Sequence, residues 1–292
     1  MSDDDRANPL GSYLRARRAL VTPEQAGLAP GANRRVPGLR REEVALLAGV
    51  SIDYYTRLER GRAGGASESV LEGIARALQL DEAERAHLFD LARAASAPAA
   101  PRAPRRPARQ AVSPSIQRIL DSMTTTPAYV RNARLDMLAT NRLARALYSP
   151  VLTSQAQPPN NARFLFLDPG AREFYPEWER QAADIVALLR TEAGRSPHDK
   201  ALTGLIGELS TRSEEFRGWW AAHNVRFHRS GVKRYHHPEV GDLTLTYDAL
   251  DLAADPELRI SAYTAEPGSS SEDALRLLAS WAATLDQAEN AV

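Results

Sequence analysis

The beginning of this 292-residue chain is rich in arginine, the residue type that gives it a chemistry of its own. Between Arg6 and Arg62 there are eleven arginines against five acidic residues, a local net charge of +6, although the whole chain is neutral. Guanidinium groups bind phosphate oxygens and guanine O6 and N7. From residue 113 onward, 19 basic residues stand against 23 acidic ones. We therefore expect any polyanion to bind the N-terminal part. Taken alone, the charge count fits a solvated surface equally well.

The sequence has few features typical of a catalytic or metal site. Cysteine is absent, which excludes disulfides and thiolate sites. The pairs His223/His228 and His236/His237 have no carboxylate at a spacing typical of metal sites. There is no Gly-x-Ser-x-Gly elbow or phosphate loop, and the glycines of 61–65 follow a helix pattern, which argues against dinucleotide binding. We expect no catalytic residue, no metal ligand, no cofactor and no enzymatic activity.

Two short helices must position the arginines. Gly49 ends the first helix, and Ser51 is placed to cap the second. Helical spacing predicts a buried stripe made of Val44, Leu47, Ala48, Tyr55 and Leu58. The opposite side of the second helix carries Asp53, Tyr54 and Arg57. This pattern predicts a helix-turn-helix with an outward surface on its second helix.

The segment Leu39–Gly61, with its runs Glu-Glu-Val-Ala-x-x-Ala-Gly-Val-Ser and Leu-Glu-Arg-Gly, resembles the lambda-repressor/Cro-like (XRE-type) helix-turn-helix domain. The resemblance implies a five-helix DNA-binding domain, here residues 1–94, whose helix Ser51–Arg60 enters the major groove. The family usually has Ser or Thr followed by Gln where this chain has Arg40 and Arg41. We expect no N-cap hydrogen bond there, and two arginines that suit phosphate oxygens.

The predicted DNA-binding residues form two groups. The phosphate contacts are Arg34, Arg35, Arg40, Arg41 and Arg60. The reading helix supplies Ser51, Ile52, Asp53, Tyr54, Thr56 and Arg57. Arg57 and Asp53 are the candidates for base edges, and Ile52 either meets a thymine methyl or packs internally. The loop 29–38, longer than usual for the family, either lies against DNA or is a mobile insertion.

Other helices of the N-terminal domain follow from spacing and capping patterns. We expect a first helix from Leu10 to Leu20 and one further turn after the capping box 22–25. Capping boxes at 69–72 and 81–84 open two more helices, the last of which reaches Arg93. Residues 95–112, rich in Pro, Ala and Arg, predict an extended linker.

Residues 113–285 have the pattern of an α+β domain, followed by a tail at 286–292. Strands are expected at 127–130, 134–139, 232–237, 243–247 and 258–263. Helices are expected at 114–123, with Ile116, Ile119 and Leu120 inward, and at 141–147, 178–192, 198–210, 213–223 and 271–285, the last capped by Ser271. Residues 149–161 read as a loop. The result is a five-stranded antiparallel sheet with helices on one side, a PAS-like arrangement.

Segments Pro127–Asn141, Ser213–Val225, His237–Gly241 and Tyr263–Ser269 resemble the MmyB-like ligand-binding domain, which follows XRE-type heads in actinobacterial regulators. The resemblance implies a sensor with an apolar pocket for a small, fatty-acid-like ligand. Candidate pocket residues are Tyr129, Phe166, Trp178, Phe216, Trp219 and Trp220, with Arg131, Asn132 and Asn141 for a carboxylate head group. The same aromatics suit an ordinary core, and the same polar residues suit turns and caps.

These expectations describe a cytoplasmic, ligand-responsive transcriptional repressor that binds an inverted-repeat operator as a homodimer. No apolar run approaches the length of a membrane span, and no apolar segment follows the acidic start. The alternative is a protein–protein interaction or dimerisation adaptor that has lost ligand sensing.

Overall fold

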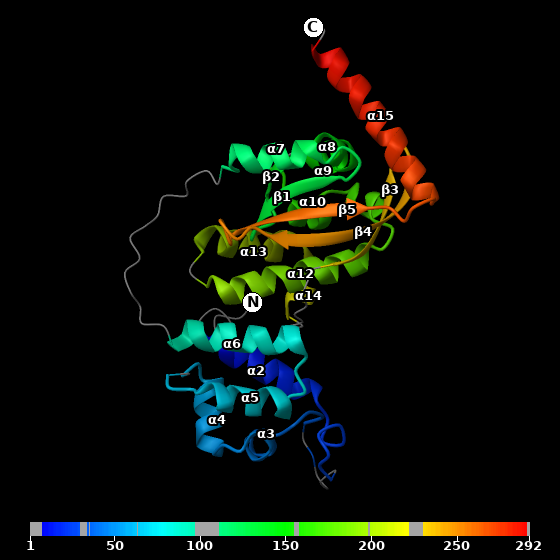
Figure 1. Ribbon diagram of the computed structural model, residues 1–292. Coiled ribbons are helices and arrows are strands. Elements are labelled where there is room, and N and C mark those ends of the chain that lie inside the picture. Colours follow the sequence, from blue (N-terminus) through cyan, green and yellow to red (C-terminus); the bar gives the residue numbers. More distant parts are fainter. Residues whose placement is uncertain are drawn as a thin grey trace. The chain divides into compact units, whose positions relative to one another are not determined.

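The computed structural model describes residues 8–29, 34, 36–62, 64–96, 111–154, 158–197, 199–221 and 230–290 (Figure 1). Arg35 and most of the predicted linker lie outside the described residues. The chain divides into two compact units. The first comprises Met1–Ala103, Val186–Gly204 and Glu214–Phe227, and the second comprises Pro104–Ile185, Leu205–Ser213 and His228–Val292.

Among the described residues, the N-terminal part of the first unit contains five helices, the number predicted. They are α2 (Pro9–Leu20), α3 (Arg41–Ala48), α4 (Ile52–Glu59), α5 (Glu68–Ala77) and α6 (Glu82–Ser96). Helix α4 touches α2 and α3, whereas α6 packs on α2 and α5 (Figure 1). Their common core includes Leu10, Tyr13, Leu14, Leu39, Tyr55, Leu58, Ile74, Leu78 and Leu88.

Helices α2 and α4 approach each other closely at Gly11. A Cβ atom at this position would overlap the Glu59 carbonyl oxygen. The Asn8 side chain bridges the two helices, because its Oδ1 accepts from the Gly11 N–H at 2.8 Å and its Nδ2 donates to the Glu59 carbonyl at 2.8 Å. The N-terminus of α2 is therefore attached directly to the C-terminus of α4.

The turn between α3 and α4 has the predicted structure. Gly49 ends α3 in the left-handed region, with φ of 68°, which costs glycine little because it has no Cβ. The Ser51 hydroxyl caps α4 by accepting from the Tyr54 N–H at 3.1 Å. Helix α3 has no side-chain N-cap from Arg40, also as predicted, although the Glu43 carboxylate accepts from the Arg40 backbone N–H at 2.6 Å.

Two predictions for this unit are wrong in detail. Leu47 is 37% exposed, and Ala45 occupies the buried position instead. The reason is that α5 approaches α3 at the Ala48 backbone, next to Gly73, so the buried face centres on Ala45 and Ala48. The cap of α5 is Ser67, not the predicted Ser69 box, since the Ser67 hydroxyl accepts from the Val70 N–H. The boxes at 22–25 and 81–84 form as predicted.

The sheet of the second unit has five antiparallel strands in the order β2-β1-β5-β4-β3. The strands are β1 (Ala128–Asn132), β2 (Met137–Thr140), β3 (Ser230–His237), β4 (Gly241–Asp251) and β5 (Leu258–Thr264). Register pairs Tyr129 with Ser261, Tyr247 with Tyr263, and Lys233 with Leu245. The predicted combination of a helical N-terminal domain and an antiparallel sheet with helices is confirmed.

The helices after the linker are α7 (Pro114–Ser122), α8 (Arg142–Leu147), α9 (Ser149–Leu152), α10 (Asn161–Leu167), α11 (Ala171–Phe174), α12 (Trp178–Arg195), α13 (Lys200–Arg212), α14 (Glu214–Ala221) and α15 (Ser270–Asn290). Helices α9, α10 and α11 were not predicted, so the expected loop at 149–161 is partly helical. Helix α15 extends beyond the predicted end at 285. Its first turn is capped by Ser269, whereas the Ser271 hydroxyl accepts from the Thr244 N–H of β4.

Helices cover both faces of the sheet, which corrects the prediction of one covered face. On one face, Leu120 of α7 packs with Ala128, Val130, Leu258 and Ile260. Ile119, expected to point inward, is instead 47% exposed. The other face carries tyrosines that contact Phe174 of α11 and Tyr148 at the end of α8, and Phe164 of α10 packs on Phe174. We call this second surface the tyrosine face.

Candidate nucleic-acid interface and tyrosine face

Helix α4 has one side buried in the core and the opposite side exposed. Tyr55 and Leu58 are buried in the core, whereas Ile52, Asp53 and Arg57 are exposed. The Arg57 guanidinium lies over the Tyr54 ring at 5.2 Å from its centroid. This contact orients the arginine along the exposed side of α4. Thr56 is half-buried, and the Ser51 hydroxyl is occupied as the cap.

Several arginines predicted to contact phosphate are engaged in ion pairs within the unit. Arg34 forms two parallel hydrogen bonds to the Glu43 carboxylate, at 2.6 and 3.0 Å. These bonds lower the pKa of Glu43 below its usual range. Arg40 makes a longer, exposed contact of 3.4 Å to Glu42. Arg34 and Arg40 therefore lie next to carboxylates of α3, which the sequence count did not anticipate. Arg60 is exposed at the C-cap of α4.

Glu59 is the centre of a buried ion-pair cluster. Its carboxylate accepts from Arg18 Nε at 2.7 Å and from Arg41 Nε at 2.5 Å. The Glu59 side chain is 2% exposed, that of Arg18 16% and that of Arg41 50%. Arg41 thus connects the start of α3 to the end of α4 and still reaches the surface.

A shallow hollow of about 530 Å³ lies beside the exposed side of α4. Its lining comes from α3, the turn and the first residue of α4, namely Glu42, Glu43, Ala45, Leu46, Val50, Ser51 and Ile52. Leu46 and Ile52 are exposed at its edge. Since Ile52 is half-exposed rather than packed in the core, its methyl groups are accessible from outside.

The tyrosine face forms the aromatic centre of the second unit. Tyr148 makes edge contacts with Tyr129 and Tyr235, and its hydroxyl is 2.8 Å from that of Tyr235. Tyr129 stacks on Tyr263, and its hydroxyl accepts from Asn161 Nδ2 at 2.9 Å. Burial raises the pKa values of Tyr148, Tyr235 and Tyr263, so these hydroxyls stay protonated and act as hydrogen-bonding groups.

The predicted pocket aromatics make different ring contacts. Tyr129 belongs to the tyrosine face. Phe166 contacts Trp178, whose indole N–H donates to the Leu165 carbonyl at 2.9 Å. Phe216 stacks on Trp220, and Trp219 is half-buried. The composition of the sequence did not distinguish these groups.

Two of the predicted head-group anchors have structural contacts. The Asn132 side chain accepts from the N–H groups of Arg134 and Asp136 and holds the β1–β2 turn. Asn141 caps α8 and donates to the carbonyls of Met123 and Thr126. Arg131, the third, is a buried side chain on β1, on the same sheet face as Tyr129.

Lys233 is a buried residue of this face that the sequence reasoning missed. It is 7% exposed, and its Nζ lies 4.7 Å from the Tyr247 ring centroid and 5.9 Å from that of Tyr263. Burial and the nearby charge of Arg131 lower its pKa to about 8. The signal was present, since β3 alternates and Lys233, Tyr235 and His237 share one face.

The histidine pair of β3 has structural contacts. His237 is buried, with Nε2 donating to the Ala146 carbonyl at 3.1 Å and Nδ1 accepting from the Glu239 N–H at 3.2 Å. Burial lowers its pKa. His236 contacts Asp242 on the surface. Within the described ranges no group of three His, Asp or Glu side chains could hold a metal ion. His223 and His228 lie outside those ranges.

Family models match both parts of the chain. One described as the MmyB-like transcription regulator ligand binding domain matches residues 112–278, and one described as a helix-turn-helix domain matches residues 9–88. Both predicted resemblances are thereby confirmed. A search of curated proteins found no match. In the part of the chain that the structure describes, no helix is long and apolar enough to cross a membrane.

Proposed function

Because the chain belongs to the MmyB-like transcription regulators and carries a helix-turn-helix domain before its ligand-binding domain, we propose that α4 is the recognition helix of a ligand-responsive repressor. The repressor binds an inverted-repeat operator as a homodimer, with one α4 in each half-site. Residues 1–94 are the DNA-binding domain and residues 113–285 the ligand-binding domain. Neither matching family is an enzyme family by its description.

The observation that carries the proposal is the two-sided burial of α4. Tyr55 and Leu58 fix the helix in the core, which leaves Asp53 and Arg57 exposed in successive turns. Arginine is suited to guanine O6 and N7, and the exposed methyl groups of Ile52 suit a thymine methyl. Arg57, Asp53 and Ile52 are therefore proposed as base-reading residues.

The arginines around α3 are proposed as phosphate contacts that fix the register of the domain on the duplex. Arg41 fits this role best, because half of its side chain is exposed while its Nε is held by Glu59. Such a pre-positioned guanidinium loses less side-chain entropy on binding than a free one. Arg34, Arg40 and Arg60 complete the set in the described residues.

Fluorescence anisotropy with the protein's own promoter region and with random DNA of equal length tests the proposal. Arg57→Ala should lower the preference for the promoter by about 10- to 100-fold, the cost of one lost base contact of roughly 1–3 kcal/mol. Arg41→Ala should weaken binding to both DNAs alike and reduce the slope of affinity against salt by about one counterion.

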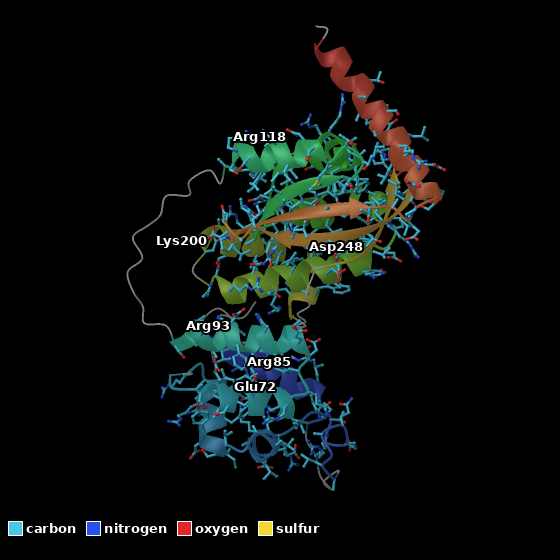
Figure 2. The ribbon with its side chains drawn as sticks, in the orientation of Figure 1. Glu72, Arg85, Arg93, Arg118, Lys200 and Asp248 are labelled. Atoms are coloured by element: carbon cyan, nitrogen blue, oxygen red, sulfur yellow. The ribbon has the colours of Figure 1, made fainter. Side chains whose placement is uncertain are left out.

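Arg93→Ala is the matched control. Arg93 lies on α6, on the side of the bundle away from α3 and α4 (Figure 2), and its side chain is exposed and pairs with Asp90. This variant should bind both DNAs like the wild type. If Arg57→Ala and Arg41→Ala also bind like the wild type, the proposed interface is wrong. A protein–protein adaptor would not change the anisotropy of the promoter fragment at all.

The ligand acts, in this proposal, by binding two arrangements of the dimer with different affinities. Ligand binding then shifts the population toward one arrangement and changes operator affinity by at most the ratio of the two ligand affinities. Anisotropy titrations with and without ligand measure the change in operator affinity.

A further inference from the structure

Part of one sheet face is exposed in the second unit. On the face opposite the tyrosine face, Leu120 of α7 packs against Ile260 of β5. The next two strands in the sheet, β4 and β3, alternate between buried residues on the tyrosine face and exposed residues on the α7 side. We call this exposed area the open face, and its residues are Val232, Arg234, Thr244, Thr246, Asp248 and Leu250.

The centre of the open face is uncharged. Val232 of β3 stands directly opposite Thr246 of β4, and Thr244 is the next residue of β4 on that face. The side chains of Val232 and Leu250 are 42% and 48% exposed. Leu250 pairs with Ile260 across β4 and β5, so the apolar core under α7 continues into the open face. A solvated face of an antiparallel sheet is normally polar, which these aliphatic groups are not.

Charges of opposite sign lie on the two sides of this centre. Arg234 is two residues beyond Val232 on β3, and Asp248 is two residues beyond Thr246 on β4. Because the strands are antiparallel, these steps run in opposite directions. With a rise of about 3.3 Å per residue, the two positions are about 13 Å apart along the strands. Within one copy of the chain the positive and negative charges are therefore well separated.

The Arg234 guanidinium can bind a second carboxylate. One of its five N–H donors contacts Glu177 at 2.8 Å. These side chains are 59% and 28% exposed, and exposed ion pairs contribute little to stability. The other charged pair of these strands, His236 with Asp242, lies at the far end of the face and is closed within the copy. Arg234 and Asp248 are thus the charges that the open face offers to a partner.

We propose that the open face is the homodimer surface, and that it packs on the same face of a second copy. A two-fold axis that crosses the strands at Val232 and Thr246 brings Arg234 of each copy near Asp248 of the other, with the uncharged centres in contact. Sheets packed face to face lie about 10 Å apart, a distance that the arginine and aspartate side chains span together. An axis along the strands would instead bring like charges to the same end of the interface.

This charge pattern is the reason for choosing a second copy as the partner. A closed two-fold interface requires one patch that is complementary to itself, and a positive and a negative group on opposite sides of an apolar centre meet that requirement. This inference rests on the homodimer of the proposed function and names its surface.

The absence of cysteine from the chain allows a direct cross-linking test in the full-length protein. Val232→Cys places a single thiol on the proposed axis, opposite its counterpart in the second copy. A short bismaleimide, with a spacer close to the sheet separation of about 10 Å, should join two copies covalently. Leu277→Cys on α15 is the matched control, because Leu277 is also exposed, and it should give monomers on a denaturing gel. Equal cross-linking of the two variants, or none of Val232→Cys, would overturn the proposal.

Charge reversal tests the predicted pairing separately. In a two-fold dimer each substitution changes two contacts, so Asp248→Arg and Arg234→Asp should each weaken the dimer by about 10- to 100-fold at low salt. Sedimentation velocity measures this change. An equimolar mixture of the two variants should dimerise like the wild type, because each reversed charge then meets an opposite one. Asp273→Arg, at an exposed carboxylate of α15, is the matched control and should dimerise normally.

Two outcomes of the sedimentation experiment would contradict the surface. One is wild-type dimerisation by both reversed variants, which would place the dimer contact elsewhere, and the other is a mixture that dimerises no better than its components. These measurements involve no DNA. A dimer through the open face in a protein that does not bind DNA would contradict the proposed function alone, whereas promoter binding by a dimer that Asp248→Arg leaves intact would contradict this inference alone.

Discussion

Removal of the buried Glu59 carboxylate should be among the most destabilising single substitutions where α2, α3 and α4 meet. Glu59→Ala leaves Arg18 and Arg41 without their shared anion. Loss of one partner of a buried ion pair costs about 3–5 kcal/mol. Arg18 keeps its hydrogen bond to the Leu39 carbonyl at 2.9 Å, and the half-exposed Arg41 can be rehydrated, which places the expected cost near the lower limit, about 3 kcal/mol.

Amide hydrogen exchange measured by mass spectrometry is the suitable assay, because it reports on α2 and α4 separately from the rest of the chain. A loss of about 3 kcal/mol should accelerate exchange of the most protected amides in these helices by about 100-fold. Tryptophan fluorescence is less useful, since residues 1–103 contain no tryptophan.

Glu42→Ala provides the control, because Glu42 is exposed and its contact with Arg40 is long. Exposed pairs contribute about 0–1 kcal/mol. If Glu59→Ala exchanges no faster than Glu42→Ala, the view of Glu59 as the centre of the cluster is refuted. The double variant Arg18→Met with Glu59→Met should recover part of the loss, since an apolar pair of similar volume can replace a buried ion pair.

Two further perturbations test the second unit. The pKa of His237 is lowered from 6.5 in the folded state. Its contribution to the free energy of unfolding should therefore be fully present above pH 6.5 and decrease as the pH falls toward the pKa of the folded state. Urea unfolding of the wild type should show this loss of stability, and His237→Phe should show less of it. If the stability of both proteins falls equally with pH, His237 is excluded as the source. Leu120→Ala should cost about 2–5 kcal/mol by opening a cavity under α7, whereas its exposed neighbour Ile119→Ala should cost under about 0.5 kcal/mol, and equal effects would contradict the assigned face.

Much of the fold could be predicted from spacing and capping residues. The helix-turn-helix was predictable because Gly49 and Ser51 act locally, through backbone conformation and one hydrogen bond. The exposure of Leu47 was not predictable, because helical spacing permits several rotations of a two-turn helix about its axis. The close approach of Gly73 to Ala48 selects one of these rotations. For the same reason Ile119 was assigned to the wrong side of α7.

The tyrosine face shows the limit of sequence reasoning for the site. Arg131 and Tyr129 were named as candidates because they belong to a recognisable segment. Lys233 was not named, although it alternates with Tyr235 and His237, because lysine is usually exposed. Its burial depends on helices that cover β3, which strand periodicity does not determine. The paired arginines of the DNA-binding domain illustrate a related limit, since a net charge of +6 does not show that Arg34 and Arg41 each meet a carboxylate.

The contact at Gly11 has a consequence for variation in this chain. Even alanine at position 11 would push α2 off the end of α4 by the width of a methyl group, and the side chains of α4 that are proposed to meet base pairs would tilt with it. On that proposal, a change remote from the DNA would alter the affinity for DNA. Substitutions where α2 crosses α4 should therefore alter DNA binding, as should substitutions of the residues proposed to meet the bases.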